Sequence, residues 1–245
     1  MELLLNDRYA PITHSIGFIK KPMDEVVEAF IKWQKPLQQK REISLTVFEE
    51  KGKLANVFDK LLPLTDRERL RYLFIPTRNN YTAYFDNGWR GSDIFSAVSM
   101  LSRLLNCVGI RAEFVPHTLN GQYTKAKGRY GATILEVYSP DTKSIIGIKR
   151  GIFVVYDGNK WTFDTSADGE PFSFEDKQLN LNKKVRDRFT FENLNDYLQK
   201  LEINALDEDF YLSEQKSYMI EKTGNINKDL KYYTLFEARE SIGLE

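Results

Sequence analysis

The chain has 245 residues, of which 42% are hydrophobic and 13% aromatic, and its 35 basic residues balance 35 acidic ones. This length and composition support a folded core and exclude low-complexity chains and disulfide scaffolds. The neutral net charge disfavours a protein that tracks nucleic acid or an anionic membrane. Because Cys107 is the single cysteine, the chain has no internal disulfide and no cysteine-based metal site.

Two features bear on where the protein resides. The leucines at positions 3–5 are too few for the apolar region of a signal peptide, and no apolar run approaches the ~20 residues of a membrane-spanning helix. A single cysteine suits a reducing compartment. We therefore expect a cytoplasmic protein without a membrane partner.

The first third of the chain alternates strand-like and helix-like segments. Strands are predicted at residues 15–20, 43–48, 70–75 and 81–85, and helices at 23–33 and 54–62. Pro36 and Pro63 are expected to end the two helices, because proline lacks the N–H that a helix interior needs.

The segment from Asp86 to Asp93 precedes the most regular helical pattern of the chain, at residues 94–108. We expect this helix to be central and buried along one face. Ser92 or Asp93 is expected to cap it by accepting backbone N–H bonds, and a role in binding or catalysis stays open for both. Arg90 either holds an anion together with the free helix amides or lies over the Trp89 ring.

The second half of the chain predicts an antiparallel meander followed by helices. Strands are expected at residues 112–115, 133–138, 144–149, 151–156 and 160–164, and a helix capped by Thr190 at 191–201. The expected fold class is therefore α+β. Its central buried helix packs on a largely antiparallel sheet, with N-terminal strand–helix units and C-terminal helices.

The domain organisation follows from the absence of a Gly/Ser-rich or Pro-rich linker. We predict one domain over residues 1–245. Within it, residues 1–75 are expected to form an N-terminal α/β extension, residues 76–205 the core and residues 206–245 a C-terminal tail.

The sequence gives no support for metal or cofactor chemistry. His14 and His117 have no His or Cys partner at metal-ligand spacing, and the glycine-rich loops of nucleotide-binding folds are missing. We therefore predict no metal site and no cofactor. Cys107 is expected to be buried and unreactive among apolar neighbours, and His117 to be a solvated side chain.

The order of elements from Gly88 to Thr165 resembles the core of the transglutaminase-like group of papain-like cysteine proteases. Residues 88–108 are similar to the helix that bears the catalytic cysteine in that group. Residues 109–113, which read Gly-Ile-Arg-Ala-Glu, resemble the turn after that helix, and residues 131–138 and 161–165 resemble the strands that carry its histidine and aspartate. The resemblance covers about 80 residues and implies the shared fold.

The same comparison implies that the cysteine chemistry is absent. Ser92 or Asp93 stands at the cysteine position and Gly131 at the histidine position, so only Asp164 of the triad is retained. The segment from Tyr84 to Asp93 also resembles bacterial proteins of unknown function, which adds no mechanism.

We therefore expect a non-catalytic cytoplasmic bacterial protein that binds another protein, in the manner of an immunity or adaptor protein. No nucleophile–base pair is visible, and the 32 aromatic residues are candidates for interface anchors. Tyr123, the basic loop at 125–129 and the acidic run at 207–209 are further candidates for surface contact. No nucleic-acid partner is expected, and the oligomeric state stays open.

The alternative is a hydrolase or transferase with a pocket at the N-terminus of the central helix. The candidate pocket or binding residues are Asp86, Trp89, Arg90, Ser92, Asp93 and Asp164. Arg90 and the helix amides would hold a small-molecule anion, and an aspartate would act as base. This alternative predicts that Asp164 lies close to Ser92 or Asp93.

Overall fold

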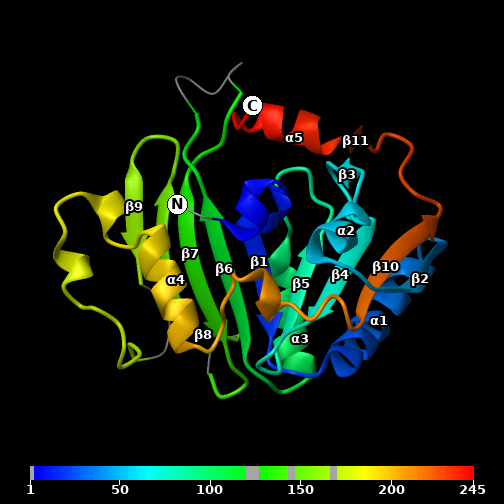
Figure 1. Ribbon diagram of the computed structural model, residues 1–245, viewed down its shortest axis with the longest axis horizontal. Coiled ribbons are helices and arrows are strands. Elements are labelled where there is room, and N and C mark those ends of the chain that lie inside the picture. The colour runs from blue at the N-terminus through cyan, green and yellow to red at the C-terminus, as the bar shows by residue number, and fades with distance from the viewer. Residues whose placement is uncertain (1–2, 120–126, 143–146, 166–169) are drawn as a thin grey trace.

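The computed structural model describes residues 3–119, 127–142, 147–165 and 170–245. In these residues, helices pack on a nine-stranded antiparallel sheet with the strand order β2-β10-β4-β5-β1-β6-β7-β8-β9 (Figure 1). A separate two-stranded sheet pairs β3 with β11. The α+β class predicted from the sequence is confirmed.

The bounds of the elements are as follows. The strands are β1 (Ser15–Ile19), β2 (Ile43–Glu50), β3 (Leu64–Thr65), β4 (Arg71–Pro76), β5 (Thr82–Asp86), β6 (Gly109–Val115), β7 (Ala132–Tyr138), β8 (Ile148–Tyr156), β9 (Trp161–Asp164), β10 (Ser217–Gly224) and β11 (Tyr232–Tyr233). The helices are α1 (Met23–Gln39), α2 (Leu54–Asp59), α3 (Ile94–Leu104), α4 (Phe191–Lys200) and α5 (Leu235–Ser241). None of the described helices is long and apolar enough to cross a bilayer.

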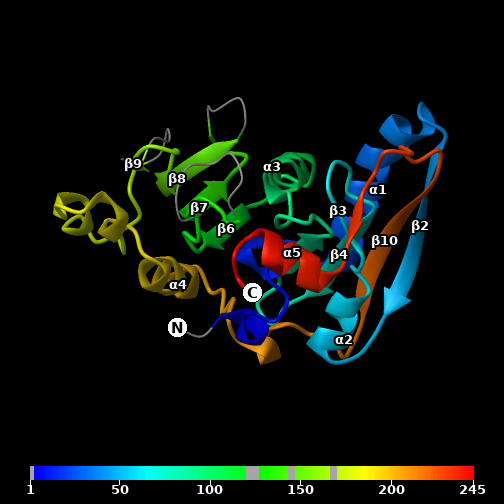
Figure 2. The same cartoon turned by 90° about the horizontal axis from the view of Figure 1, so that it is seen from above.

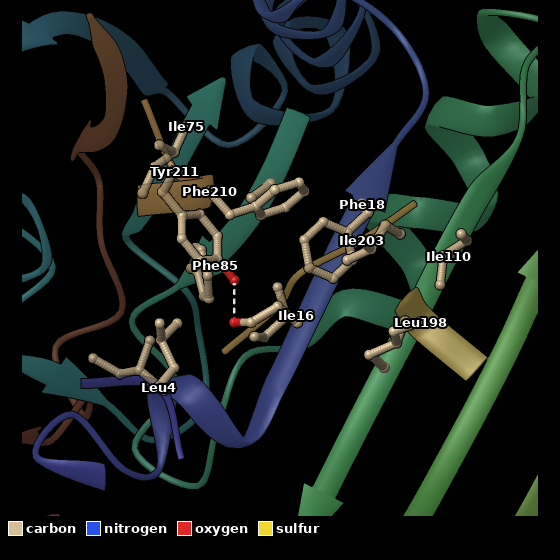
Figure 3. Packing of buried hydrophobic residues seen from close by; sticks show 14 of the residues in the cluster. Leu4, Ile16, Phe18, Ile75, Phe85, Ile110, Leu198, Ile203, Phe210 and Tyr211 are labelled. Atoms are coloured by element: carbon tan, nitrogen blue, oxygen red, sulfur yellow. Dashed lines mark hydrogen bonds between the residues drawn. The ribbon is translucent and has the colours of Figure 1, made fainter. Parts of the chain in front are cut away.

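The large sheet has a hydrophobic core on each face. Helices α1 and α3 cover one face, and α2, α4 and the N-terminal segment cover the other (Figure 2). Figure 3 shows Phe85, Phe210 and Tyr211 packed together in the second core, with Phe18 beside Phe210. Each face of the central strands is therefore removed from water, which accounts for the fully buried pattern of β1 and β5.

Helix α3 lies close to the sheet because two glycines face it. A Cβ atom at Gly17 of β1 would lie 2.7 Å from a methyl carbon of Val98, and one at Gly109 of β6 would lie 1.9 Å from the hydroxyl oxygen of Ser102. The helix ends at Leu104, earlier than predicted, because Asn106 adopts a left-handed conformation with φ 49°. Leu104, at the end of the predicted apolar stripe, is 52% exposed.

Two local predictions were wrong. Pro36 does not end α1, which continues to Gln39 with the proline inside it. Pro36 is exposed, so water can satisfy the helix carbonyl that its missing N–H leaves unbonded. The break predicted near Arg150 is absent, since β8 runs through it. The Arg150 guanidinium forms a two-pronged ion pair with Glu175, which compensates its buried charge.

The subdivision into extension, core and tail also differs from the architecture. Strand β1, from the predicted extension, lies in the middle of the sheet between β5 and β6. Strand β10, from the predicted tail, lies between β2 and β4. Hydrophobic periodicity reveals which residues are buried but not which strands pair, so the sequence did not indicate this interleaving.

Candidate functional site

The candidate site is built around the segment Asp86–Asp93, which joins β5 to α3 and is called the helix mouth below. Asp86 is fully buried, and its carboxylate accepts the N–H groups of Gly88 at 3.0 Å and Asp93 at 2.8 Å. It also lies 3.2 Å from Nε of Arg69. These contacts of the buried carboxylate stabilise the turn between Gly88 and Asp93.

Burial has a large effect on the protonation of Asp86. It raises the pKa of the carboxyl group to about 6, although Arg69 and the two N–H groups favour the charged form. A raised carboxyl pKa is typical of functional sites, but buried ion pairs in ordinary cores show it too. The partners of the Asp86 carboxylate are Gly88, Asp93 and Arg69 of the fold itself, which favours a structural role.

Ser92 also bonds within the helix mouth. Its hydroxyl accepts the Asp86 N–H at 3.0 Å and donates to the Asp86 carbonyl at 3.2 Å. Asp93 is the N-cap residue of α3, but its side chain makes no capping hydrogen bond. The prediction that Ser92 or Asp93 caps the helix with its side chain was therefore wrong, because Ser92 binds the end of β5 instead.

The exposed part of the helix mouth is aromatic and cationic. The Trp89 ring stacks on Tyr233 with a centroid distance of 4.7 Å and an interplanar angle of 11°. The guanidinium carbon of Arg90 lies 4.5 Å from the centroid of the Trp89 ring, as one of the two sequence alternatives for Arg90 predicted. Tyr232 and Phe236 are 55% and 61% exposed. We call Trp89, Arg90, Tyr232, Tyr233 and Phe236 the aromatic surface.

Short backbone pairings hold the aromatic surface together. Thr65 of β3 pairs with Tyr232 of β11 and bridges to Gly88 of the helix mouth. The Trp89 N–H donates to the Thr65 carbonyl at 3.0 Å. In Figure 1, β3, β11 and α5 lie next to one another near the C-terminus. Segments separated by about 140 residues in the sequence thus form one surface.

Asp164 does not join this site. It is exposed at the end of β9, the edge strand that lies five positions from β5 in the sheet. At roughly 4.8 Å per strand, Asp164 is about 24 Å across the sheet from the strand that carries Asp86. Acid–base catalysis requires hydrogen-bond distances, so the predicted grouping of Asp164 with Ser92 and Asp93 is not formed.

An ionic cluster between α3 and the sheet was not predicted from the sequence; Arg111 and Glu113 in it are half-buried, and Glu136 and Tyr138 are buried. Arg111 of β6 bonds Glu113 at 2.7 Å and Glu136 of β7 at 3.0 Å, and Tyr138 donates to Glu136 at 2.8 Å. Burial and the nearby Glu136 carboxylate raise the pKa of Tyr138. The only sequence signal was a glutamate in the middle of the apolar strand 133–138. The four groups satisfy one another, so the cluster presents no free acid or base.

The remaining sequence candidates are placed as follows. Cys107 is buried, and burial raises the pKa of its thiol to about 11, so it is a weak nucleophile, as predicted. His117 is exposed, but it also packs 4.6 Å from the ring of Tyr156 and contacts Trp161. Tyr123 and residues 125–126 lie outside the described residues. Among residues that are described, no group of three or more His, Cys, Asp or Glu side chains is placed to hold a metal ion.

Two hollows in the described part of the chain lie away from the helix mouth. One of about 500 Å³ lies between α1 and α3 and is lined by Glu28, Trp33 and Leu104, among others. Another of about 210 Å³ lies beside Arg150 and Glu175. Neither hollow is lined by a residue of the predicted pocket.

Comparison with known proteins gives no relative. No family model matches the chain, and no curated protein or solved structure matches it at a significant level. The likeness to the transglutaminase-like core therefore rests on the short motifs and stays a prediction. At Gly131, the family's histidine position, a Cβ atom would lie 2.6 Å from the Trp161 ring and 2.7 Å from Cβ of His117.

Proposed function

We propose that this chain is a non-catalytic cytoplasmic protein that binds a protein partner through the aromatic surface, as immunity and adaptor proteins do. The observation that carries the proposal is the layered contact of Arg90, Trp89 and Tyr233. Tyr232 and Phe236, which are near Tyr233 in the sequence, are more than half exposed. Tryptophan, tyrosine and arginine are the residues most enriched among those that dominate binding energy at protein interfaces.

The arrangement also lowers the entropic cost of binding. Trp89 is held by Tyr233 on its ring and by Thr65 at its backbone, and Arg90 is placed against the indole. Side chains that are already ordered lose less conformational freedom when a partner binds. Isolated large aromatic side chains at a surface are common, but side chains that contact one another, as Arg90, Trp89 and Tyr233 do, indicate an interaction site.

The enzyme alternative receives less support. A hydrolase at the helix mouth needs a serine whose hydroxyl is free to attack and a base within reach. Ser92 is bonded to the backbone of Asp86, Asp86 is bonded within the turn, and Asp164 lies across the sheet. If the chain has a transglutaminase-like core, we infer that this core serves binding rather than catalysis.

A photo-crosslinking experiment tests the binding proposal. Benzoylphenylalanine replaces Phe236 in one protein and Leu181, which is 74% exposed and lies outside the aromatic surface, in another. Irradiation in lysate of the source cells is expected to capture one protein at a defined mass from position 236 and none from position 181. Equal capture at both positions, or none at position 236, contradicts the proposal.

A matched pair of arginine variants gives the second arm of the test. Arg90→Ala is expected to reduce crosslinking from position 236 by at least about tenfold, as expected when one interface anchor worth 1.4 kcal/mol or more is removed. Arg67→Ala is the control, since Arg67 is an exposed arginine whose ion pair is with Asp66, outside the aromatic surface. Equal loss in both variants indicates that charge alone, and not this surface, attracts the partner.

A further inference from the structure

A small cavity lies between the N-terminal segment, β6 and α4. Its volume is about 40 Å³, and its lining is mostly apolar. Figure 3 shows three of the lining residues, Leu4, Ile16 and Leu198, which belong to the N-terminal segment, β1 and α4. Leu3 and Leu206 also line the cavity but are only half-buried, and the cavity is partly open to solvent. A small molecule can therefore reach it from outside.

Two buried polar atoms of the lining residues have no hydrogen-bond partner in the described part of the chain. They are Nδ1 of His14 and the hydroxyl oxygen of Thr13. The His14 side chain is only 2% exposed. Buried polar atoms in folded proteins nearly all have a hydrogen-bond partner, either in the protein or in a bound molecule. Two unpaired atoms on adjacent residues that line one cavity therefore indicate a site for a hydrogen-bonding group.

The other nitrogen of His14 determines which kind of group fits. Nε2 lies 3.1 Å from a carboxylate oxygen of Asp7, and an ionised carboxylate only accepts hydrogen bonds. Nε2 therefore carries the hydrogen of the neutral imidazole, which leaves Nδ1 with a lone pair that accepts. Asp7 is held in turn, because Arg239 of α5 donates to its carbonyl. The bound group must donate a hydrogen bond to His14.

The lining favours an alcohol as the bound molecule. A hydroxyl group can donate its hydrogen to His14 and accept the hydrogen of the Thr13 hydroxyl. Apart from these two residues and the half-buried Asn195, every residue that lines the cavity in the described structure is apolar. Such a lining packs well against hydrocarbon, whereas a buried water typically makes about three hydrogen bonds to polar groups.

We propose that this cavity binds a short linear alcohol. The alcohol donates its O–H to Nδ1 of His14, accepts from Thr13 and packs its hydrocarbon chain against Ile16, Leu194 and Leu198. A cavity of about 40 Å³ holds only a few non-hydrogen atoms, so the chain is short. The site is separate from the aromatic surface, and the inference does not depend on the proposed function.

Nitrogen NMR of the imidazole rings tests the site in the full chain. The chain has two histidines, and the spectrum of His117→Gln assigns the signals of each. We expect added 1-butanol to shift Nδ1 of His14 saturably. His117 is an internal control that is expected not to respond, since its Nδ1 already accepts the Gly131 N–H at 3.1 Å.

An isomer of 1-butanol isolates the hydrogen bond. Methyl propyl ether has the same atoms but no O–H to donate, so we expect it to bind at least about tenfold more weakly. Three results overturn the proposal. They are the absence of a saturable shift at His14, as for a cavity that holds water alone, equal affinity for the two compounds, and a His14 ring protonated at both nitrogens.

A threonine variant tests the second contact. Thr13→Val removes the hydroxyl at nearly constant volume, and it is expected to weaken 1-butanol binding at least about fivefold. Thr46→Val, at an exposed position of β2 outside the cavity, is the matched control and is expected to bind as wild type does. Circular dichroism checks that both variants are folded. Unchanged 1-butanol affinity in folded Thr13→Val contradicts the proposed placement of the hydroxyl.

Discussion

At the scale of single residues, the helix mouth shows how a polar segment that looks catalytic can be structural. Asp86 and Ser92 have the residue types of an active site and lie just before the start of α3. The structure instead turns both inward. Ser92 bonds the backbone of Asp86, and the Asp86 carboxylate accepts the N–H groups of Gly88 and Asp93 and lies beside Arg69. Arg69 is distant enough in sequence that only the tertiary fold reveals it as the partner.

The pKa of Asp86 gives a pH-dependent prediction. Because burial raises this pKa to about 6 from an ordinary value near 4, the folded state keeps a proton that the unfolded state loses. The stability that this group contributes is therefore fully present below about pH 4 and is lost as the pH rises through about 6. Relative to Asp86→Asn, which does not titrate, the wild-type free energy of unfolding is expected to fall by up to about 3 kcal/mol between pH 4 and pH 7.

Urea denaturation of the two proteins at a series of pH values measures this difference. Asp157→Asn is the control, because the N–H groups of Lys160 and Asn159 lower the pKa of the exposed Asp157 carboxyl. Its effect on stability has the opposite sign, since the lowered pKa favours the folded state as pH rises. A difference between wild type and Asp86→Asn that stays constant over this range contradicts the assigned pKa.

Ser92 gives a prediction that separates a structural serine from a nucleophile. In Ser92→Ala the buried Asp86 N–H loses its acceptor, which is expected to cost about 1–3 kcal/mol in the free energy of unfolding. Ser96→Ala, at an exposed position in the first turn of α3, is expected to change stability by no more than about 0.5 kcal/mol. Urea denaturation curves compare the two. Equal stability of both variants would remove the structural role assigned to Ser92.

At the scale of elements, the sequence correctly predicted helices and strands whose position depends on neighbouring residues in the chain. The capping box of Thr190 and Asn193 begins α4 where the sequence placed a helix, and β1 matches the strand predicted at residues 15–20 to within one residue. Errors arose where an element depends on its surroundings. Pro36 is tolerated because it is exposed, and Arg150 is tolerated within β8 because Glu175 compensates its charge.

The contact between α3 and the sheet gives a prediction at this scale. Gly109→Ala places a methyl group against the Ser102 hydroxyl and Val98, and overpacking of this kind is expected to cost about 1–3 kcal/mol. Adding Ser102→Ala removes the nearest atom and is expected to restore part of the loss. Thermal denaturation of the single and double variants measures both effects. If Ser102→Ala restores none of the stability lost in Gly109→Ala, the close approach of α3 to the sheet at this point is not the cause of that loss.

At the scale of the whole molecule, the fold is held together by pairings between distant segments. Arg71 of β4 bonds Glu221 of β10 at 2.9 Å, and Arg239 near the C-terminus donates to the Asp7 carbonyl at 2.5 Å. One hydrophobic core contains residues from Leu4 to Ala238. The fold class was predicted because hydrophobic periodicity is a local property of the sequence. The strand order was not predicted because it depends on pairing between distant segments.

Truncation provides the test of this arrangement. Removing residues 206–245 deletes β10, which leaves β2 without a sheet neighbour and takes Phe210, Tyr211 and Ile220 out of the two cores. We expect this protein to show no cooperative unfolding transition by circular dichroism. A second protein that ends at Gly224 keeps β10 and loses only β11 and α5, so it is expected to unfold cooperatively at a lower Tm. If residues 206–245 were a dispensable tail, both truncated proteins would unfold cooperatively near the wild-type Tm, and the placement of β10 between β2 and β4 would be refuted.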